Sequence, residues 1–504
     1  MDGVPWELIL AQDYFSFLGF TSNPFENNTA EREPHIELYA VRPPYLDRVL
    51  KTSAEKGIFV LSGSRGSGKS ATRITVAKSL WSRTRGPLVV PLIGFNVFRP
   101  YVKNLIPLDV YSDQVCFLVV EQILGWLSSL GDEEAARRLN SLTKDQKQLT
   151  DRLVSNFYLN RSDNSRATSV HACFEVLDVS LARKGVMWAE KRWDHLASVV
   201  STLANSVARK VADFDIGDPK SYEALLQYQQ QEGFNDPVYV FSKAVELARA
   251  FGFSGVVLHV DKVDETDWTN SSVSASGDLI YPLLTNIQLH EVDGLTWTFF
   301  LWDKVRDYLC VENKRPVRWD KIPNGKISWN DSYLRELINR RIGYFSNDAL
   351  EGLESICDSS VDINAIYSEL FKLSEKSPRN LITLLDKVMS EHIQLHQENH
   401  RKLDSESFSL GLDAYSIDSV SNLGVTTSVE QLTKLRALHF VTKDVAARFR
   451  ISNPAARSRI DQWVENGLVE YAGSQVGPAG GRPVDQFEVA DPRLQRIIER
   501  DLSV

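Results

Sequence analysis

Eight consecutive residues match the phosphate-loop pattern G-x-x-x-x-G-K-[ST] at every position: Gly63, Ser64, Arg65, Gly66, Ser67, Gly68, Lys69 and Ser70. Glycines let such a loop curl until successive N–H groups face one anion, and the following helix adds positive charge from its N-terminus. Lys69 is expected to neutralise the β- and γ-phosphates, and the hydroxyl of Ser70 to ligate Mg²⁺. We therefore predict that residues 63–71, Ala71 included, bind ATP with Mg²⁺.

A second run of residues that could take part in chemistry is acidic and follows an apolar stretch. Asp261 comes directly after Val-Val-Leu-His-Val at 256–260, and Asp264 and Glu265 follow it. A carboxylate at the end of a strand beside the phosphate loop can hold the Mg²⁺ shell, a role we assign to Asp261. Another acid must orient or deprotonate the attacking water. Asp264 and Glu265 compete for that catalytic role, and the alternative for each is a solvated helix cap.

Short, β-branched apolar runs predict the strands that position these residues. Four runs have this composition, at 57–62, 88–93, 255–260 and 297–302. The first leads into the phosphate loop, and a helix over about 69–82 leaves it. Strands and helices joined by crossovers predict a parallel sheet. The predicted fold class is therefore α/β, with a parallel-sheet P-loop NTPase core.

The rest of the chain predicts additions to that core. The expected parts are an N-terminal segment at 1–50, an ATPase core at 51–330 with a helical insertion at about 100–236, a helical lid at 331–415 and a separate domain at 427–504. Asp236 and Ser377 have the residue type of helix N-caps, and each precedes a proline suited to the first helical position. The serine- and aspartate-rich residues 403–423 predict a linker.

Composition excludes several classes for the chain as a whole. The 504 residues are 43% hydrophobic and 24% charged, which is ordinary for a globular protein. Lys+Arg 57 against Asp+Glu 66 gives a net charge of −9, so the chain is not a general polycation for nucleic acid. No apolar run reaches the roughly 18–20 residues that span a bilayer. The N-terminus lacks a basic secretory start and the four cysteines are widely spaced, so we expect a cytoplasmic protein with reduced thiols.

The last 78 residues or so have a pattern of their own. Helical stretches at 429–438, 442–449 and 453–467 precede two strand-like runs around a Gly/Pro-rich tip at 473–483. This order, with Trp-Val-Glu-Asn-Gly-Leu-Val-Glu at the end of the third helix, resembles a winged helix-turn-helix domain. In a DNA-reading version the third helix enters the major groove, which makes Arg457 and Arg459 the predicted DNA-binding residues. A protein-interaction module is the alternative, since the segment is not strongly basic.

The glycine-rich and acidic motifs together resemble those of the AAA+/STAND branch of P-loop ATPases, of the Orc/Cdc6-like type. The acidic run has the form hhhhD-x-h-D-E, which is closer to the STAND and NACHT pattern than to the plain hhhhDE of AAA+ proteins. Residues 19–25 and 37–43, taken with the phosphate loop, resemble uncharacterised bacterial ATPases of this kind. Lys262 stands where an AAA+ protein carries its catalytic glutamate. The resemblance therefore implies nucleotide binding with slow hydrolysis.

The same resemblance points to residues that complete the site. Residues 376–381, Lys-Ser-Pro-Arg-Asn-Leu, resemble the lid motif whose arginine reports the loss of the γ-phosphate. This implies a catalytic role for Arg379, with a surface arginine as the alternative. An arginine finger from a neighbouring subunit would be Arg315, Arg318, Arg340 or Arg341, among which the sequence does not choose. AAA+ proteins carry a small polar residue, the first sensor, at the end of the fourth strand. Trp302 stands at that position here, and it fits the end of an ordinary strand better than it fits a sensor.

These motifs predict a homo-oligomeric switch ATPase that is not associated with membranes. ATP binding is expected to close the lid and present a surface for assembly, and slow hydrolysis to reset it. The output would be DNA engagement or signalling to an effector protein encoded nearby, as in antiphage defence. The alternatives are an initiator or partition protein that uses nucleotide as a structural clamp, and a ring-forming motor, for which the sequence has no clear pore motif.

Overall fold

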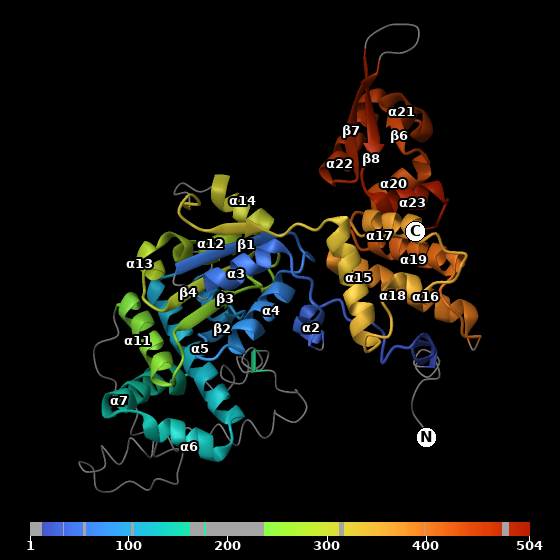
Figure 1. Cartoon of the computed structure of the whole chain (residues 1–504). Coiled ribbons are helices and arrows are strands. Elements are labelled where there is room, and N and C mark those ends of the chain that lie inside the picture. The colour runs from blue at the N-terminus through green and yellow to red at the C-terminus, as the bar shows by residue number, and fades with distance from the viewer. Residues whose placement is uncertain are drawn as a thin grey trace. The chain divides into compact units, whose positions relative to one another are not determined.

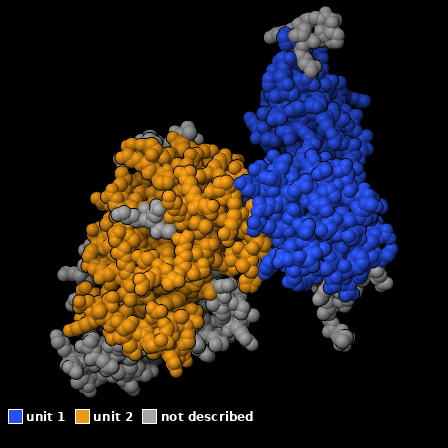
Figure 2. All heavy atoms as spheres, in the orientation of Figure 1, with its two compact units in different colours: residues 1–33, 329–504 blue, residues 34–328 orange. Residues whose placement is uncertain are grey.

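The computed structural model describes residues 13–33, 35–53, 57–101, 105–161, 176–177, 236–311, 317–397, 399–475 and 483–503. The chain divides into two compact units (Figure 2). We call residues 34–328 the sheet unit, and residues 1–33 with 329–504 the helical unit. The N-terminal segment predicted at 1–50 is thus shared between the two units. Most of the predicted insertion beyond residue 161, and Arg315, lie outside the described residues.

A five-stranded parallel sheet forms the centre of the sheet unit (Figure 1). Its strands are β1 (Gly57–Gly63), β2 (Leu88–Leu92), β3 (Val256–Val260), β4 (Leu295–Trp302) and β5 (Asn324–Lys326), in the order β2-β3-β4-β1-β5. The first four confirm the predicted strands to within two residues at each end, and with them the α/β fold class. The sequence does not predict β5, because Asn-Gly-Lys has none of the β-branched or aromatic residues that mark a strand.

Helices cover both faces of this sheet. Side chains alternate across a strand, so Val90, Leu258 and Trp297 point to one face, where they share a hydrophobic cluster with α5 (Leu108–Ser129) and α11 (Pro237–Ala250). The other face carries α3 (Pro44–Ser53) and α4 (Lys69–Trp81). There the hydroxyls of Ser53 and Thr298 lie 3.0 Å apart. The phosphate loop therefore opens a helix that is seated on the sheet along its length.

The described part of the predicted insertion is helical, as expected. Besides α5 it contains α6 (Asp132–Ser141), α7 (Lys144–Leu153) and a π-helical turn at Val154–Leu159. The predicted N-cap Asp236 is confirmed, because its carboxylate accepts a hydrogen bond from the backbone N–H of Val238 at 3.0 Å. The remaining elements of the sheet unit are α2 (Ile36–Tyr39), a 3₁₀ turn at Asn96–Tyr101, α12 (Val273–Thr285), α13 (Ile287–His290) and α14 (Asp303–Val311).

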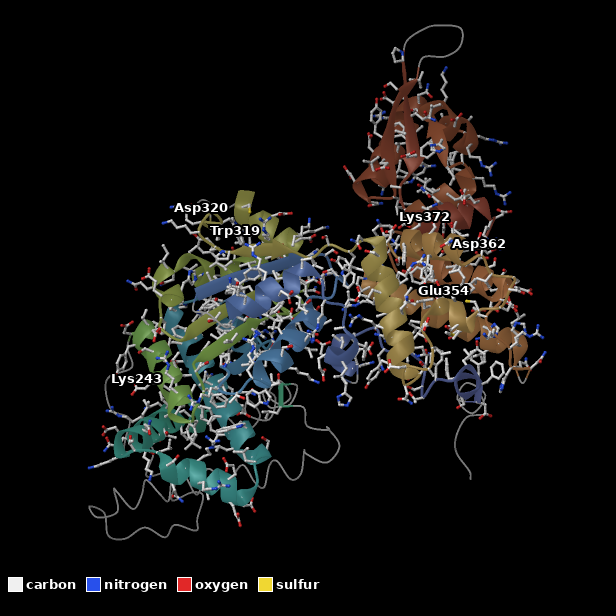
Figure 3. All side chains as sticks on the ribbon, viewed as in Figure 1. Lys243, Trp319, Asp320, Glu354, Asp362 and Lys372 are labelled. Atoms are coloured by element: carbon white, nitrogen blue, oxygen red, sulfur yellow. The ribbon has the colours of Figure 1, made fainter. Side chains whose placement is uncertain are left out.

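The helical unit contains residues 331–415, for which the sequence predicts a lid. Its helices are α15 (Asp331–Phe345), α16 (Leu353–Ile356), α17 (Ile363–Leu373), α18 (Pro378–His396) and α19 (Ser405–Ser421). Asp362 caps α17 (Figure 3) by accepting hydrogen bonds from two backbone N–H groups at 3.1 Å. Ser377 caps α18 with Pro378 at its first position, as predicted.

The predicted linker at 403–423 is wrong, because α19 fills most of it. Small residues there serve close packing rather than flexibility. A Cβ added at Gly411 would lie 2.5 Å from the Cα of Val388 on α18, so the two helices approach at a point that admits no side chain. Ser407 and Ser416 are fully buried on the same helix.

Residues 13–33 pack against α15 and α18 of the same unit. The backbone N–H of Thr21 donates to the carbonyl of Phe345 at 2.8 Å, and the amide of Asn23 donates to Asp386 at 2.7 Å. Arg341 is only 3% exposed and lies 2.5 Å from a carboxylate oxygen of Glu33. Its Nε also donates to the carbonyl of Pro24 at 2.7 Å. A short 3₁₀ turn, Ala30–Arg32, precedes this ion pair.

The end of the chain forms its own hydrophobic cluster within the helical unit. Its elements are α20 (Thr426–Leu435), β6 (His439–Val441), α21 (Thr442–Phe449), α22 (Asn453–Glu465), β7 (Val469–Gln475), β8 (Val484–Val489) and α23 (Pro492–Glu499). The strands form an antiparallel sheet in the order β6-β8-β7, and Phe487 of β8 and Trp463 of α22 are both buried in the cluster. Val420 of α19 belongs to the same cluster, so this core begins before residue 427. No helix in the described ranges combines the length and apolarity needed to cross a bilayer.

Candidate functional site

The phosphate loop is a tight turn between β1 and α4, residues 64–68. Two glycines provide the conformations it needs: Gly66 has φ 76° and Gly68 has φ 91°, in the left-handed region. Gly63 is closely packed as well, since a Cβ there would lie 2.5 Å from the hydroxyl oxygen of Ser67. The loop is therefore closely packed against itself, as the predicted phosphate-binding turn requires.

Lys69 begins α4 and folds back over this loop. Its ammonium group donates hydrogen bonds to the carbonyl oxygens of Gly63 at 3.1 Å and Ser64 at 2.9 Å. Burial lowers the pKa of Lys69, while nearby carboxylates, Asp261 foremost, oppose that shift. A lysine held at the loop in this way can deliver a positive charge to an anion bound there.

Asp261 lies at the carboxyl end of β3 and is 2% exposed. Its Oδ2 accepts a hydrogen bond from the hydroxyl of Ser70 at 2.8 Å, so the two residues predicted to bind the metal lie together. Its Oδ1 accepts from the backbone N–H of Lys262 at 2.9 Å. A hydroxyl and a carboxylate are hard oxygen donors, the kind that Mg²⁺ prefers. The donor set therefore fits the predicted cofactor.

Arg73 approaches the same carboxylate from one turn further along α4. Its Nε lies 2.9 Å from Asp261 Oδ2, and its side chain is fully buried. Buried His259, two residues before Asp261, faces the same helix. Its burial, and to a lesser degree the charge of Arg73, lower the pKa of His259 to about 3, so the imidazole is neutral. The sequence motifs give no sign of Arg73, because its partner is 188 residues away.

The second acid, Asp264, is bound by the phosphate loop itself. Its Oδ2 accepts hydrogen bonds from Arg65 Nε at 3.0 Å and from Arg65 Nη2 at 2.8 Å. The guanidinium also lies over the ring of Trp302 at the end of β4, 4.2 Å from its centroid. Arg65 thus joins the loop to the ends of two neighbouring strands. The third acid, Glu265, is exposed, and its N–H donates to the carbonyl of Lys262, which has φ 61°.

The predicted lid arginine and arginine fingers occupy different settings. Arg379 is exposed in the first turn of α18, in the helical unit, whereas the phosphate loop belongs to the sheet unit. Arg318 binds Asp320 (Figure 3) through two hydrogen bonds, and Arg340 binds Glu336 at 2.7 Å. Arg341 is wrong as an arginine finger, because it is buried against residues 24–33 of its own unit and cannot reach a neighbouring subunit.

The two arginines predicted to read DNA lie on α22 and both contact groups of their own domain. Arg457 makes ion pairs with Asp461 at 3.2 Å and with Asp485 at 3.1 Å. Arg459 lies over the ring of Phe449, 4.5 Å from its centroid. Both arginines lie on the predicted third helix, but the charge of Arg457 is balanced by two local carboxylates.

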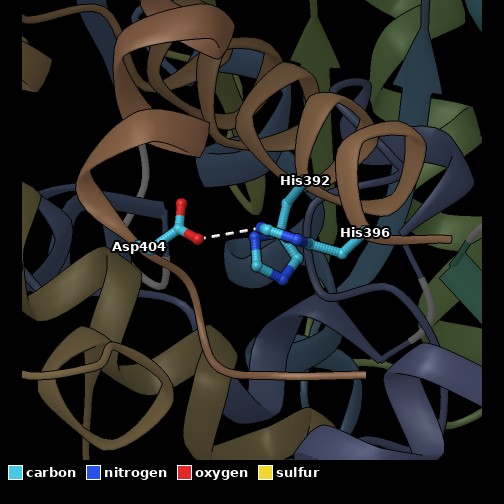
Figure 4. A group of neighbouring side chains, drawn as sticks. All are labelled: His392, His396 and Asp404. Carbon is cyan, nitrogen blue, oxygen red and sulfur yellow. Dashed lines mark hydrogen bonds and ion pairs between the residues drawn. The ribbon is translucent and has the colours of Figure 1, made fainter. Parts of the chain in front are cut away.

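One cluster in the helical unit has the residue types of a metal site (Figure 4). The ligand atoms of His392, His396 and Asp404 lie within 4.8 Å of one another. Each of them already has partners: His392 contacts the hydroxyl of Ser407 at 2.6 Å and the carbonyl of Arg401 at 3.1 Å. His396 lies 2.8 Å from Asp404, which also caps α19. These hydrogen bonds fasten α18 to the start of α19 and account for the cluster without a metal.

No protein-family model and no curated protein matches this chain. Several solved structures are similar to it, including two from the same organism. One is the ORC1 protein of Aeropyrum pernix in complex with DNA, at 11% identity over 94% of this chain and 97% of that chain, with a TM-score of 0.39. The other is the ORC2 protein of the same organism in ADPNP–ADP complexes, at 10% identity over 95% and 96%, with a TM-score of 0.35. A likeness at this level assigns no role to any residue of this chain.

Proposed function

We propose that the chain is an ATP-binding switch that hydrolyses ATP slowly and acts through its C-terminal domain. The observation that carries this proposal is the complete phosphate-loop motif in a tight strand–loop–helix turn, with Ser70 and Asp261 in contact beside it. A bare glycine-rich turn needs neither the buried carboxylate nor the lysine over the loop. Each of these is a part of a nucleotide site.

The residues of this site take distinct roles. Backbone N–H groups of residues 64–68 and the ammonium of Lys69 hold the phosphates. Ser70 would provide a hydroxyl for a magnesium ion and Asp261 would hold the ion's shell, and the ion would neutralise phosphate charge. Both residues are positioned by regular elements, α4 and β3, which keeps their separation fixed.

We assign the orientation of the attacking water to Glu265 rather than Asp264. Two hydrogen bonds from Arg65 engage Asp264, so this carboxylate fixes the loop instead of accepting a proton. Glu265 is exposed, follows the same strand and lies four residues after Asp261. Slow turnover is consistent with this arrangement, because Lys262 stands where a typical AAA+ protein carries its catalytic glutamate.

The helical unit would convert nucleotide state into an output. We propose that Arg379 senses the γ-phosphate as the lid closes, and that a second copy of the chain contributes Arg318 or Arg340 in a homo-oligomer. We propose that the C-terminal domain is a winged helix, which its element order α20-β6-α21-α22-β7-β8 supports. DNA contact through Arg457 and Arg459 is one output. Protein contact is the second, and it is favoured by the ion pairs of Arg457 with Asp461 and Asp485.

A role in antiphage defence, with an effector encoded nearby, stays a prediction. It is tested by the gene neighbourhood, where a nuclease or another toxic effector is expected. An initiator would instead bind duplex DNA by itself, with affinity that falls steeply as salt rises.

The function itself is tested by Lys69→Ala. ATP affinity measured by calorimetry should fall by about 10- to 100-fold, since a charge-assisted hydrogen bond contributes about 1.5–3 kcal/mol. Lys51→Ala removes an exposed lysine of α3 in the same unit and should leave affinity unchanged. Equal affinity in wild type and Lys69→Ala, with both proteins folded by circular dichroism, rejects the proposed site.

A further inference from the structure

Arg73 is the residue of the site that a nucleotide-binding motif does not require. It lies three residues after Ser70 on α4, and its side chain is 0% exposed. Its Nε reaches the same carboxylate oxygen, Asp261 Oδ2, that accepts the hydrogen bond from Ser70. A single oxygen of Asp261 therefore accepts hydrogen bonds both from Ser70, the predicted metal ligand, and from the buried guanidinium of Arg73.

The charge of Asp261 is thereby balanced within the protein. An arginine keeps its proton at any pH at which the protein is folded, so the positive charge is permanent. Burial of both partners, at 0% and 2% side-chain exposure, strengthens their attraction because little water screens it. The other oxygen of Asp261 accepts the backbone N–H of Lys262, so both carboxylate oxygens are engaged.

We propose that Arg73 is a built-in counter-cation that competes with magnesium for Asp261, so that this chain binds ATP with little dependence on Mg²⁺. The inference rests on the proposed nucleotide site and concerns its regulation. A divalent ion near Asp261 meets a carboxylate that is already neutralised and a guanidinium of like charge a few ångströms away. At an effective dielectric constant of about 20, such repulsion weakens metal binding by about tenfold or more.

A purely structural ion pair makes a different prediction. If Arg73 only holds α4 on β3, replacing it changes stability and leaves the response to magnesium as it was. The two roles are separated by measuring the effect of Mg²⁺ on nucleotide affinity, which is an equilibrium property independent of turnover.

The test uses the full chain and a non-hydrolysable ATP analogue, titrated by calorimetry in millimolar Mg²⁺ and in EDTA. In the wild type the two affinities should agree within about threefold. In Arg73→Gln, Mg²⁺ should tighten binding by at least about tenfold, and Mn²⁺, followed by electron paramagnetic resonance, should bind more tightly by a similar factor. Arg73→Lys keeps the charge and should resemble the wild type. Arg83→Gln removes an exposed arginine just after the same helix and serves as the control.

Arg73→Gln leaves a buried carboxylate without its charge partner, which is destabilising. The double variant Arg73→Gln/Asp261→Asn removes both charges, and it should fold and bind the analogue equally with and without Mg²⁺. If neither variant folds, the wild type still decides, because binding that is more than about threefold tighter in Mg²⁺ than in EDTA overturns the inference.

The outcomes distinguish a failure of this inference from a failure of the proposed nucleotide-binding function on which it rests. Absence of analogue binding by the wild type in both buffers rejects the nucleotide site and the inference with it. Analogue binding with the same response to Mg²⁺ in the wild type, Arg73→Gln and Arg83→Gln retains the nucleotide site and overturns the role of Arg73.

Discussion

The three acids of the run 261–265 show how environment separates residues of one type. Asp261 is buried and bound by Ser70 and Arg73, Asp264 is buried and bound by Arg65, and Glu265 is exposed. The sequence leaves Asp264 and Glu265 as equal alternatives, because nothing local distinguishes them. The partner of Asp264 is 199 residues away, and only the fold brings it close.

Glu265→Gln should stop turnover while leaving nucleotide binding intact. Loss of a general base lowers kcat by about 10²- to 10⁴-fold, and the glutamine keeps the size and polarity of the side chain. Phosphate release at saturating ATP measures the first effect and calorimetry the second. Glu291→Gln, an exposed acid of the same unit, is the matched control. Wild-type phosphate release by Glu265→Gln contradicts the assignment.

Arg65 and Asp264 should behave as a coupled pair. Arg65→Met and Asp264→Asn each remove the link between the loop and the strand ends, so each should weaken ATP binding. The double variant should be little worse than either single one, with a coupling free energy of about 1 kcal/mol, because Arg65 is 42% exposed and solvent screens the pair. Additive effects in the double-mutant cycle, measured by calorimetry, would show that the two residues act independently.

At the scale of elements, motif and composition predict the structure correctly where it depends on residues close together in the sequence. The phosphate loop and four strands follow from short runs of residues, and the caps at Asp236 and Ser377 follow from single residue types. Helix α19 does not, because its serines, aspartates and Gly411 have the composition of a linker. Their purpose becomes visible only beside α18, where small residues permit close contact.

Gly411→Ala should therefore destabilise the helical unit, although alanine is the better helix former. The added methyl group meets the backbone of Val388 at 2.5 Å, and such overpacking costs about 1–3 kcal/mol. Gly343→Ala is the matched control, a glycine within α15 whose Cβ has ordinary contacts at 3.5 Å and beyond. It should be neutral or stabilising by up to about 1 kcal/mol. Chemical denaturation compares the two, and an equal response of both variants refutes the close contact as the cause.

At the scale of the whole molecule, the predicted boundaries and the compact units rest on different information. The predicted boundaries follow changes in composition, whereas the compact units follow contacts between residues far apart in sequence. The domain predicted from residue 427 shares its core with Val420 of α19. It is also tied to Asp413 of that helix, which accepts hydrogen bonds from Arg496 at 2.7 Å and Arg500 at 2.9 Å. No local sequence pattern predicts either connection.

Asp413→Ala should loosen α23 from α19. It leaves Arg496, a largely buried cation, without one of its carboxylates, at a cost of about 3 kcal/mol. Asp418→Ala removes an acid of the same helix whose ion pair with Lys387 is exposed, and should cost less than about 1 kcal/mol. Hydrogen exchange of α23 amides reads out the difference. Equal protection of α23 in both variants would show that Asp413 does not hold it.

The division of the chain has a consequence for the order in which it folds during synthesis. The sheet unit is one continuous stretch, residues 34–328, and all its strands have been made before α15 emerges from the ribosome. The helical unit is discontinuous in sequence. Glu33 pairs with Arg341 and Thr21 with Phe345, so neither can form its contact until the later residue has been made. Thr21 and Glu33 are thus translated before the sheet unit, yet their partners are made only after it. Until then the segment that carries them is attached to a folded sheet unit, and a nascent-chain chaperone would meet it there.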